Sequence, residues 1–220
     1  MESMVKKYQQ RFRKVKEEME KWDTLQSSLL SQFRNASSII DRLQVIRDSK
    51  NYGTLSGVDG IVDGVLRKQM ESLQTILLSM NKSLEEFHAI VLFLERIQRD
   101  ARQLVSGGSS RLTTKQLQQR VGIKPCLADC LDGLTILHDM HHSEYLLKAS
   151  LVSALPSVIF KPSSGDLAAL QQLLVDQPNI PKEEAFVFHV FLQLQSVSAI
   201  WGSVLQLNKF EGLCFTIGQV

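Results

Sequence analysis

Apolar residues recur at alternating steps of three and four along the first fifty residues of the chain. This spacing places one apolar side chain per turn on the same side of a helix and is typical of a coiled-coil-like seam. Gln26 is a polar residue on that seam, and Lys, Arg, Glu and Gln fill most positions outside it. The pattern predicts a helix near residues 4–50. Its seam residues are Val5, Tyr8, Phe12, Val15, Met19, Trp22, Leu29, Phe33, Ala36, Ile40 and Leu43.

Three more segments carry a helical pattern of apolar residues. The glycine-rich run GTLSGVDGIVDG separates the first two helices and is interpreted as a hinge, because no strand precedes it to present a phosphate-binding loop. The run SGGSS at residues 106–110 ends the second helix. The predicted helices span residues 58–105, 126–155 and 166–176.

Single residues suggest where these helices begin and end. Thr114 is expected to cap a short segment, and Pro125 suits the start of the third helix. Pro156 and Pro162 are expected to flank an irregular piece, after which Asp166 caps the fourth helix. Pro181 is expected to open one further segment.

Long amphipathic helices with short connections bury their apolar stripes best against one another. The predicted fold is therefore all-α, an antiparallel, coiled-coil-like bundle of three long amphipathic helices plus one or two short ones. We expect one bundle domain over residues 1–180, with flexible breaks near 50–58 and 106–112, followed by an atypical apolar tail over 181–220.

The tail contains an uncharged run at residues 185–207, AFVFHVFLQLQSVSAIWGSVLQL. Its length suits a membrane span. Three Gln, three Ser and His189 dilute its apolar character, however, and flanking cations are sparse. We therefore favour a buried or partner-covered helix, or a tail that arises from alternative splicing, over a membrane span.

Composition and cysteine content agree with a helical protein of a reducing compartment. The net charge of +2 does not demand a nucleic acid or membrane partner, and aromatic residues make up only 7% of the chain. The odd count of three cysteines, Cys126, Cys130 and Cys214, predicts free thiols. Because no second cysteine pair exists to complete a zinc site, Cys126 and Cys130 are expected to be buried.

The stretch HDMHHSEYLLK at residues 138–148 carries three of the five histidines. On a helix His138 lies one turn before His141 and His142, so a metal could in principle bridge them. The remaining ligand candidates, Asp139 and Glu144, spread over more than half of the helix circumference. We interpret the histidines as residues that flank a packing seam, and predict no metal and no cofactor.

Other signatures of catalysis are missing from the sequence. It contains no GxSxG, GxxxxGK[ST], GxGxxG or HExxH motif. Glu85 and Glu86 fall on the polar face of a helix, where nothing would raise a carboxyl pKa. The chain is therefore predicted not to be an enzyme.

A basic run lies near the N-terminus and contains no acidic residue. It is interpreted as a solvated helix face balanced by Glu17, Glu18 and Glu20, with contact to RNA phosphates or a nuclear import signal as alternatives. The run consists of Lys6, Lys7, Arg11, Arg13, Lys14 and Lys16.

The segment LADCLDGLTILHDMHHSEYLLKASLVSAL, followed by GDLAALQQLL, resembles the AIRIM-like family of ribosome-maturation factors, in a plant-type form, and more distantly the CDK-interacting protein CINP. The resemblance covers about residues 5–180, and the tail from Ala185 is not expected to belong to it. The residues that carry it are Trp22, Leu66, Arg67, Lys68, Gln69, Tyr145, Leu146, Leu147, Lys148, Leu151, Asp166, Leu167 and Ala168.

The resemblance implies a non-enzymatic adaptor that acts with Afg-type AAA+ ATPases and a related small helical subunit in large ribosomal subunit maturation. It implies a nuclear or cytoplasmic location and indirect contact with pre-ribosomal particles, without DNA binding. Of the residues listed above, those from Trp22 to Leu151 are the predicted partner-binding residues. In particular, Tyr145 and Lys148 are expected to form an accessible edge beside the packed face of Leu147 and Leu151. The heptads alone fit equally well a coiled-coil tether in trafficking or the cytoskeleton.

Overall fold

The computed structural model describes residues 2–107, 112–120, 126–160 and 164–180 of the 220-residue chain. All of the regular elements in these ranges are helices, so the prediction of an all-α fold is confirmed. The long helices are α1 (Glu2–Arg47), α2 (Ile61–Ser106) and α4 (Leu127–Phe160). Shorter ones are the 3₁₀ helix η1 (Ser49–Gly57), α3 (Thr114–Leu117) and α5 (Ser164–Asp176). None of the helices within these ranges is long and apolar enough to cross a membrane.

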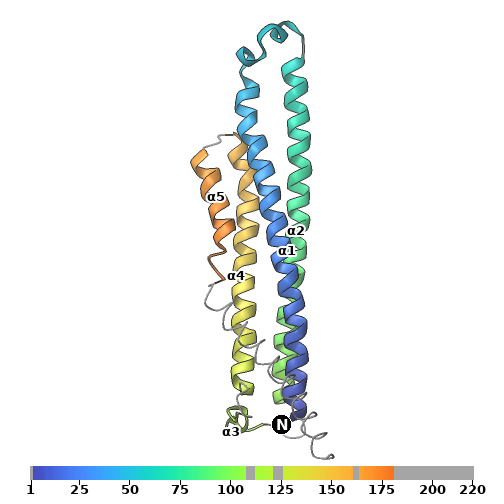
Figure 1. The fold of residues 1–220 in the computed structure, drawn as a ribbon, viewed down its shortest axis with the longest axis vertical. Coiled ribbons are helices and arrows are strands. Elements are labelled where there is room, and N and C mark those ends of the chain that lie inside the picture. The colour runs from blue at the N-terminus through green and yellow to red at the C-terminus, as the bar shows by residue number, and fades with distance from the viewer. Residues whose placement is uncertain (1, 108–111, 121–125, 161–163, 181–220) are drawn as a thin grey trace, which may run out of the picture. The chain divides into compact units, whose positions relative to one another are not determined.

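The chain divides into two compact units, and the three long helices contribute to both. The described part of the first unit comprises residues 2–16, 97–107, 112–120 and 126–136. The described part of the second comprises residues 17–96, 137–160 and 164–180. Within each unit the segments of α1, α2 and α4 pack as an antiparallel bundle, as predicted (Figure 1).

The cores of both units follow the predicted seams. In the first unit Tyr8, Phe12 and Val15 of α1 are buried with Ile97 and Ala101 of α2. The buried Tyr8 hydroxyl donates a 2.7 Å hydrogen bond to the carbonyl of Ala101, and burial raises the pKa of this phenol to about 12. In the second unit the core contains Trp22, Leu29, Phe33, Leu73, Met80, Phe87, Leu94, Leu151 and Leu155, among others.

Cys126 and Cys130 are free and buried, as predicted. Cys126 is the residue before α4, and its backbone N–H donates a 3.0 Å hydrogen bond to Asp129 Oδ2. A hydrogen bond with the Cys126 side chain, followed by this backbone bond, holds the pKa of the Asp129 carboxyl below its usual value. Burial, with the nearby Asp129 charge, raises the pKa of the Cys130 thiol to about 12, so at neutral pH this thiol is protonated and packs as an apolar group.

Three predicted helix ends were wrong. Thr113, not Thr114, caps α3, because its hydroxyl accepts from Gln116 N–H while the Gln116 side chain accepts from Thr113 N–H. Asp166 lies in the first turn of α5 instead of at its cap, where a carboxylate still favours the helix N-terminus. Pro156 lies inside α4, which continues to Phe160.

The continuation of α4 past Pro156 has a packing explanation. A proline in a helix removes one backbone hydrogen bond and crowds the preceding turn. Leu155 and Ile159 on either side of it are buried, 0% and 6% exposed, so burial of their side chains offsets that cost. The predictions for Pro125, Pro162, Pro181, Cys214 and the run at 185–207 lie outside the described residues.

The predicted hinge between α1 and α2 contains the 3₁₀ helix η1 and, within and after it, two glycines in unusual conformations. Gly53 has φ 53° and Gly60 has φ 75°, in the region that residues with a Cβ rarely adopt. Asp48 caps this segment by accepting a hydrogen bond from Lys50 N–H. The glycines therefore serve the reversal of the chain before α2.

Candidate functional site

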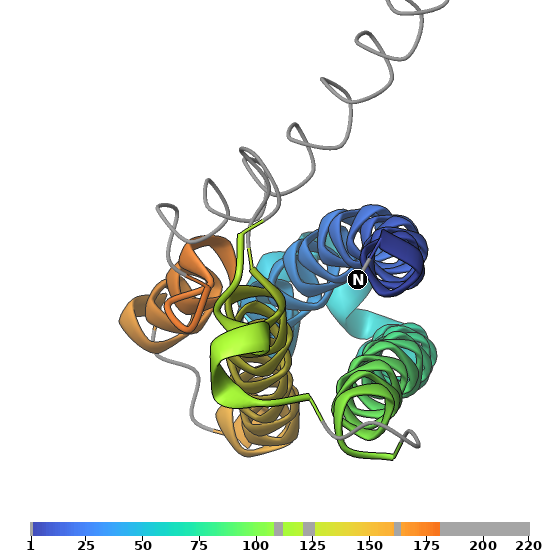
Figure 2. The same ribbon diagram turned by 90° about the horizontal axis from the view of Figure 1, so that it is seen from below.

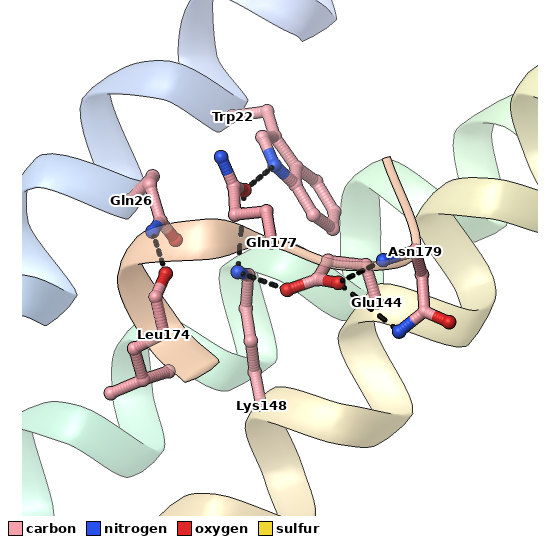
Figure 3. A network of polar contacts seen from close by, with 7 residues as sticks. All are labelled: Trp22, Gln26, Glu144, Lys148, Leu174, Gln177 and Asn179. Carbon is pink, nitrogen blue, oxygen red and sulfur yellow. Dashed lines mark hydrogen bonds and ion pairs between the residues drawn. The ribbon is translucent and has the colours of Figure 1, made fainter. Parts of the chain in front are cut away.

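A cluster of polar side chains lies in the core of the second unit, where α1, α4 and the end of α5 meet (Figure 3). Glu144 and Lys148 occupy two successive positions of the α4 seam, and both are 0% exposed. In the end-on view α5 lies alongside α4 and apart from α2 (Figure 2). The term buried polar cluster is used below for six side chains and one backbone carbonyl: Trp22, Gln26, Glu144, Lys148, Gln177, Asn179 and the Leu174 carbonyl.

The centre of the cluster is an ion pair on one helix. Lys148 Nζ lies 2.8 Å from Glu144 Oε1 and donates a second, 3.3 Å hydrogen bond to Gln177 Oε1. The other carboxylate oxygen, Glu144 Oε2, accepts 3.2 Å hydrogen bonds from both the backbone N–H and the side-chain amide of Asn179. Both charges therefore have several partners, as buried charges require.

The first helix closes the cluster from the other side. Trp22 Nε1–H donates a 3.0 Å hydrogen bond to Gln177 Oε1, and Gln26 Nε2 donates a 2.6 Å bond to the carbonyl of Leu174. Gln177 has φ 46°, an unfavourable conformation for a residue with a Cβ. Glycine would relieve that strain at this helix end, but only a side-chain oxygen can accept from both Trp22 and Lys148.

Aromatic rings surround the ammonium group. Trp22 makes edge-to-face contacts with Phe87 and His141, with ring centroids 4.5 and 4.6 Å apart. Lys148 Nζ lies 5.7 Å from the Trp22 ring and 5.6 Å from the Phe87 ring, within the range of cation–π attraction. Burial lowers the pKa of Lys148, and the hydrogen bond and charge of Glu144 oppose that shift.

The cluster fastens the end of α5 to α1 and α4. Neither charged group of the pair has exposed surface, so in this conformation no substrate reaches them. The hydrogen bonds fix residues 174–179 at defined positions on the two long helices. The arrangement is thus suited to setting a unique packing geometry and not to chemistry.

The three histidines separate on the helix surface. His138 and His142 stack with ring centroids 5.7 Å apart, and His138 Nδ1 lies 2.9 Å from Asp139 Oδ1. His141 instead points inward, 4% exposed, and its Nδ1–H donates a 2.8 Å hydrogen bond to the Leu137 carbonyl. Over the part of the chain that the structure describes, no group of three or more His, Cys, Asp or Glu could hold a metal ion.

Burial of His141 predicts a pH-dependent stability. Burial, with smaller contributions from Lys148 and His138, lowers the pKa of this imidazole from 6.5 to about 4. The folded chain keeps His141 neutral between these values while the unfolded chain takes up a proton, so stability falls as the pH drops from 6.5 to 4. At about 1.4 kcal/mol per unit, the loss reaches roughly 3 kcal/mol.

Denaturant unfolding at pH 7, 5.5 and 4.5 measures this loss. His141→Phe keeps an aromatic ring against Trp22 and removes the titration, so its stability should depend less on pH. His142→Phe, at an exposed position on the same helix, should keep the full dependence. Equal pH dependence in the two variants would contradict the assignment to His141.

The predicted partner-binding residues fall into buried and accessible groups. Trp22, Lys148 and Leu151 are in the core, at 2%, 0% and 5% exposure. The prediction that Lys148 offers its charge on an accessible edge is wrong, because its position continues the α4 seam and its ammonium group is paired inside. Tyr145, Leu147, Leu66 and Gln69 are half-buried, and Leu146, Arg67 and Lys68 are exposed.

Tyr145 lies at the surface between α2 and α4. Its ring stacks on that of His88, with centroids 5.0 Å apart and an interplanar angle of 11°. The next residue, Leu146, is 50% exposed. Of the predicted edge, Tyr145 thus lies at the surface, beside the exposed Leu146.

A shallow groove of about 720 Å³ lies between α1 and α2 of the second unit. It is lined by four carboxylates, one cation and four other residues: Glu17, Glu18, Glu20, Glu86, Lys21, Thr24, Leu25, Ala89 and Ile90. The acidic residues after the N-terminal basic run therefore gather with Glu86 on one surface.

The described part of the chain is thus an all-helical bundle in which a buried polar cluster holds α5 to α1 and α4. The model of the family described as "CA109-like: Ribosome biogenesis protein C1orf109-like" matches residues 2–198, and the chain belongs to this family. The match includes the start of the uncharged run, so the expectation that the family likeness excludes the tail from Ala185 was wrong. No curated protein sequence matches the chain significantly.

Proposed function

We propose that the chain is a non-enzymatic helical adaptor that acts with AAA+ ATPases in maturation of the large ribosomal subunit. Its membership of a ribosome biogenesis family supports the process. The observation that carries the adaptor role is an apolar surface at one end of the second unit. A partner helix would complete the packing there.

This surface belongs to what we call the distal hairpin, residues 39–47 of α1 and 61–72 of α2. Here α1 and α2 extend beyond the end of α4, so among the described helices these two pack against each other without α4 (Figure 1). The first buried residue of α2 is Leu73. The twelve preceding positions of this helix include large apolar residues of which none is buried: Ile61, Val62, Val65, Leu66 and Met70.

Uncovered apolar side chains at one place on a surface mark sites of protein association. Several large apolar residues of the described chain are at least 41% exposed. Four of them lie in or beside the distal hairpin: Val45, Leu55, Val58 and Met70. The predicted motif Leu66-Arg67-Lys68-Gln69 lies on this hairpin. Its half-buried leucine can enter a partner interface while Arg67 and Lys68 remain at the edge, an arrangement common in protein interfaces.

Gln69 adds a polar reason for a partner at this surface. Its Oε1 atom is buried and has no hydrogen-bond partner among the residues that the structure describes. A buried acceptor without a donor is unfavourable. A partner side chain that donates to this atom would therefore add the relief of this cost to the binding free energy of the hydrogen bond itself. The preferred partner is a helix of a related small subunit, which would turn two helices into a three-helix packing.

Affinity purification followed by mass spectrometry tests the proposal. We expect AAA+ ATPases and a small helical protein to co-purify, and Leu66→Ser with Met70→Ser to reduce their recovery at least tenfold. Because neither residue is buried, circular dichroism and the melting temperature should change little. Leu78→Ser, at a 64% exposed position of α2 outside the hairpin, is the control and should retain the partners.

Other outcomes separate the alternatives. Co-purification of tethering or cytoskeletal proteins in place of ATPases would favour a coiled-coil tether and contradict the adaptor proposal. Loss of partners in the Leu78→Ser variant as well would remove the hairpin from the interface. On this proposal the ATPase complex brings the chain to pre-ribosomal particles, in the nucleus or the cytoplasm.

A further inference from the structure

The two units carry opposite charge. Among its described residues the first unit has ten Lys and Arg against four Asp and Glu, whereas the second has ten against sixteen. The net charges are therefore +6 and −6 for these residues, although the whole chain has a formal net charge of only +2. The net charge of the whole chain therefore does not reveal that the first unit is strongly basic.

The N-terminal part of α1 provides most of this positive charge. Between residues 6 and 16 the buried positions are Tyr8, Phe12 and Val15. Every other position in this stretch is Lys, Arg or Gln. The basic residues exposed here are Lys6, Lys7, Arg13, Lys14 and Lys16. The solvent-facing side of this helix segment therefore carries no negative charge.

This arrangement has a cost for the isolated helix. Lys7 and Arg11 are four residues apart, and Arg11 and Lys14 three apart, so like charges neighbour each other on the helix surface. Arg11 does find local partners, since its Nη1 donates a 3.3 Å bond to the Lys7 carbonyl and its guanidinium lies 6.0 Å from the Tyr8 ring. Neighbouring like charges destabilise a helix. A sequence that keeps such an unfavourable local arrangement without better packing is expected at a functional site.

Other elements of the same unit add accessible cations. Arg102 of α2 is exposed and donates a 3.1 Å bond to Thr135 Oγ1, and Lys115 of α3 is also exposed. Arg120 lies 4.0 Å from Asp129 with most of its side chain in solvent. The Tyr8–Ala101 hydrogen bond holds the basic segment of α1 to α2 within the unit.

The surface offers charge without aromatic rings. The aromatic residues in the described part of the first unit are Tyr8 and Phe12, and both are buried. Base stacking on an aromatic platform, which single-strand binders use, is therefore not available there. Lys and Arg without such a platform suit contacts to phosphates, which position a nucleic acid without reading its sequence.

We propose that the first unit binds the phosphate backbone of structured RNA through Lys6, Lys7, Arg13 and Lys14. RNA is the expected polyanion because the chain belongs to a ribosome biogenesis family. This goes beyond the adaptor role, because an adaptor for ATPases needs no RNA contact of its own.

Filter binding or fluorescence anisotropy with the purified full-length chain and a labelled RNA hairpin tests the proposal. Affinity should fall steeply with salt, because bound counterions are released from the phosphates. Replacing Lys6, Lys7, Arg13 and Lys14 by Gln should weaken binding at least tenfold at about 0.1 M salt and make the slope of log K against log salt shallower by roughly three.

The control variant removes equal charge from the second unit. It replaces the exposed residues Arg34, Arg42, Lys50 and Lys82 by Gln and should bind RNA within about twofold of the wild type. Equal losses in both variants would show that total charge, not this surface, governs binding and would overturn the proposal. Circular dichroism confirms that both variants fold.

Two further results would also overturn it. A DNA duplex of the same sequence that binds as tightly as the RNA would remove the assignment to RNA. Salt-sensitive self-association without RNA, abolished by the variant of Lys6, Lys7, Arg13 and Lys14 and kept by the control variant, would instead show that the basic surface pairs with the acidic unit of a second copy. If the chain does not bind RNA but AAA+ ATPases still co-purify with it, the RNA proposal is wrong and the adaptor proposal is unaffected. The two proposals can therefore be tested separately.

Discussion

Replacing Glu144 by alanine should destabilise the chain by about 3–5 kcal/mol, because it leaves the buried ammonium group of Lys148 without its counter-charge. The remaining hydrogen-bond partner of Lys148 Nζ is Gln177 Oε1 at 3.3 Å. The change also removes the acceptor of both Asn179 donors. Denaturant unfolding at pH 7 measures the loss.

A double substitution separates the charge effect from packing. Glu144→Leu with Lys148→Met removes both charges and keeps apolar volume, so much of the stability lost in Glu144→Ala should return. Glu18→Ala breaks an exposed pair with Lys21 and should have far less effect. If the double variant is as unstable as Glu144→Ala, the ion pair is not the source of the loss.

The pH dependence of stability in the Glu144→Ala variant is a second test of the buried ion pair. Burial already lowers the pKa of Lys148, and removal of Glu144 takes away the groups that oppose this shift. The lone ammonium group can then lose its proton more readily at high pH. The destabilisation should therefore be larger at pH 6 than at pH 9, because a neutral amine costs less to bury.

The helices could be predicted from the sequence because their seams are long and regular. The seam of α1 from Tyr8 to Leu43 keeps its spacing through every turn, and the structure buries nearly all of it. The ends were harder to predict, since they depend on local hydrogen bonds and packing. The capping box of Thr113 and the continuation of α4 past Pro156 depend on such contacts.

The buried polar cluster was missed because the polar residues on the α4 seam were read as surface residues. The buried positions of this helix step through Leu137, His141, Glu144, Lys148 and Leu151 at intervals of four, three, four and three. The interval pattern itself was the signal that could have placed the three polar residues inside. Their partners Gln177 and Asn179 lie some thirty residues away in the chain, which no local pattern indicates.

Of the accessible surfaces, the sequence predicted only those residues that belong to a local motif. Leu66 and Gln69 carried a family resemblance, and the structure places them where α1 and α2 pack without α4 (Figure 1). The division of charge between the units could not be predicted from composition, because it depends on which segments pack together. In the first unit these are residues 2–16, 97–107, 112–120 and 126–136. The total of +2 did not demand a polyanionic partner, and contact of the basic run with RNA phosphates was left as an alternative.

Replacing Trp22 by alanine should cost about 3–5 kcal/mol and lower the melting temperature by roughly 10 °C or more. Trp22 is 2% exposed and packs against Phe87 and His141. Its loss leaves a cavity in the core and removes the Nε1–H donor to Gln177. Thermal unfolding followed by circular dichroism measures the change.

The Trp22 substitution also separates a core role from the direct partner contact that the family resemblance implies. Trp22→Phe keeps most of the ring volume and should recover much of the stability, although it cannot donate to Gln177 Oε1. If Trp22 acts through the core, partner binding should follow the folded fraction in both variants and return at low temperature, where the alanine variant is folded. A folded Trp22→Phe variant that has lost its partners would place Trp22 in the interface and contradict the core assignment.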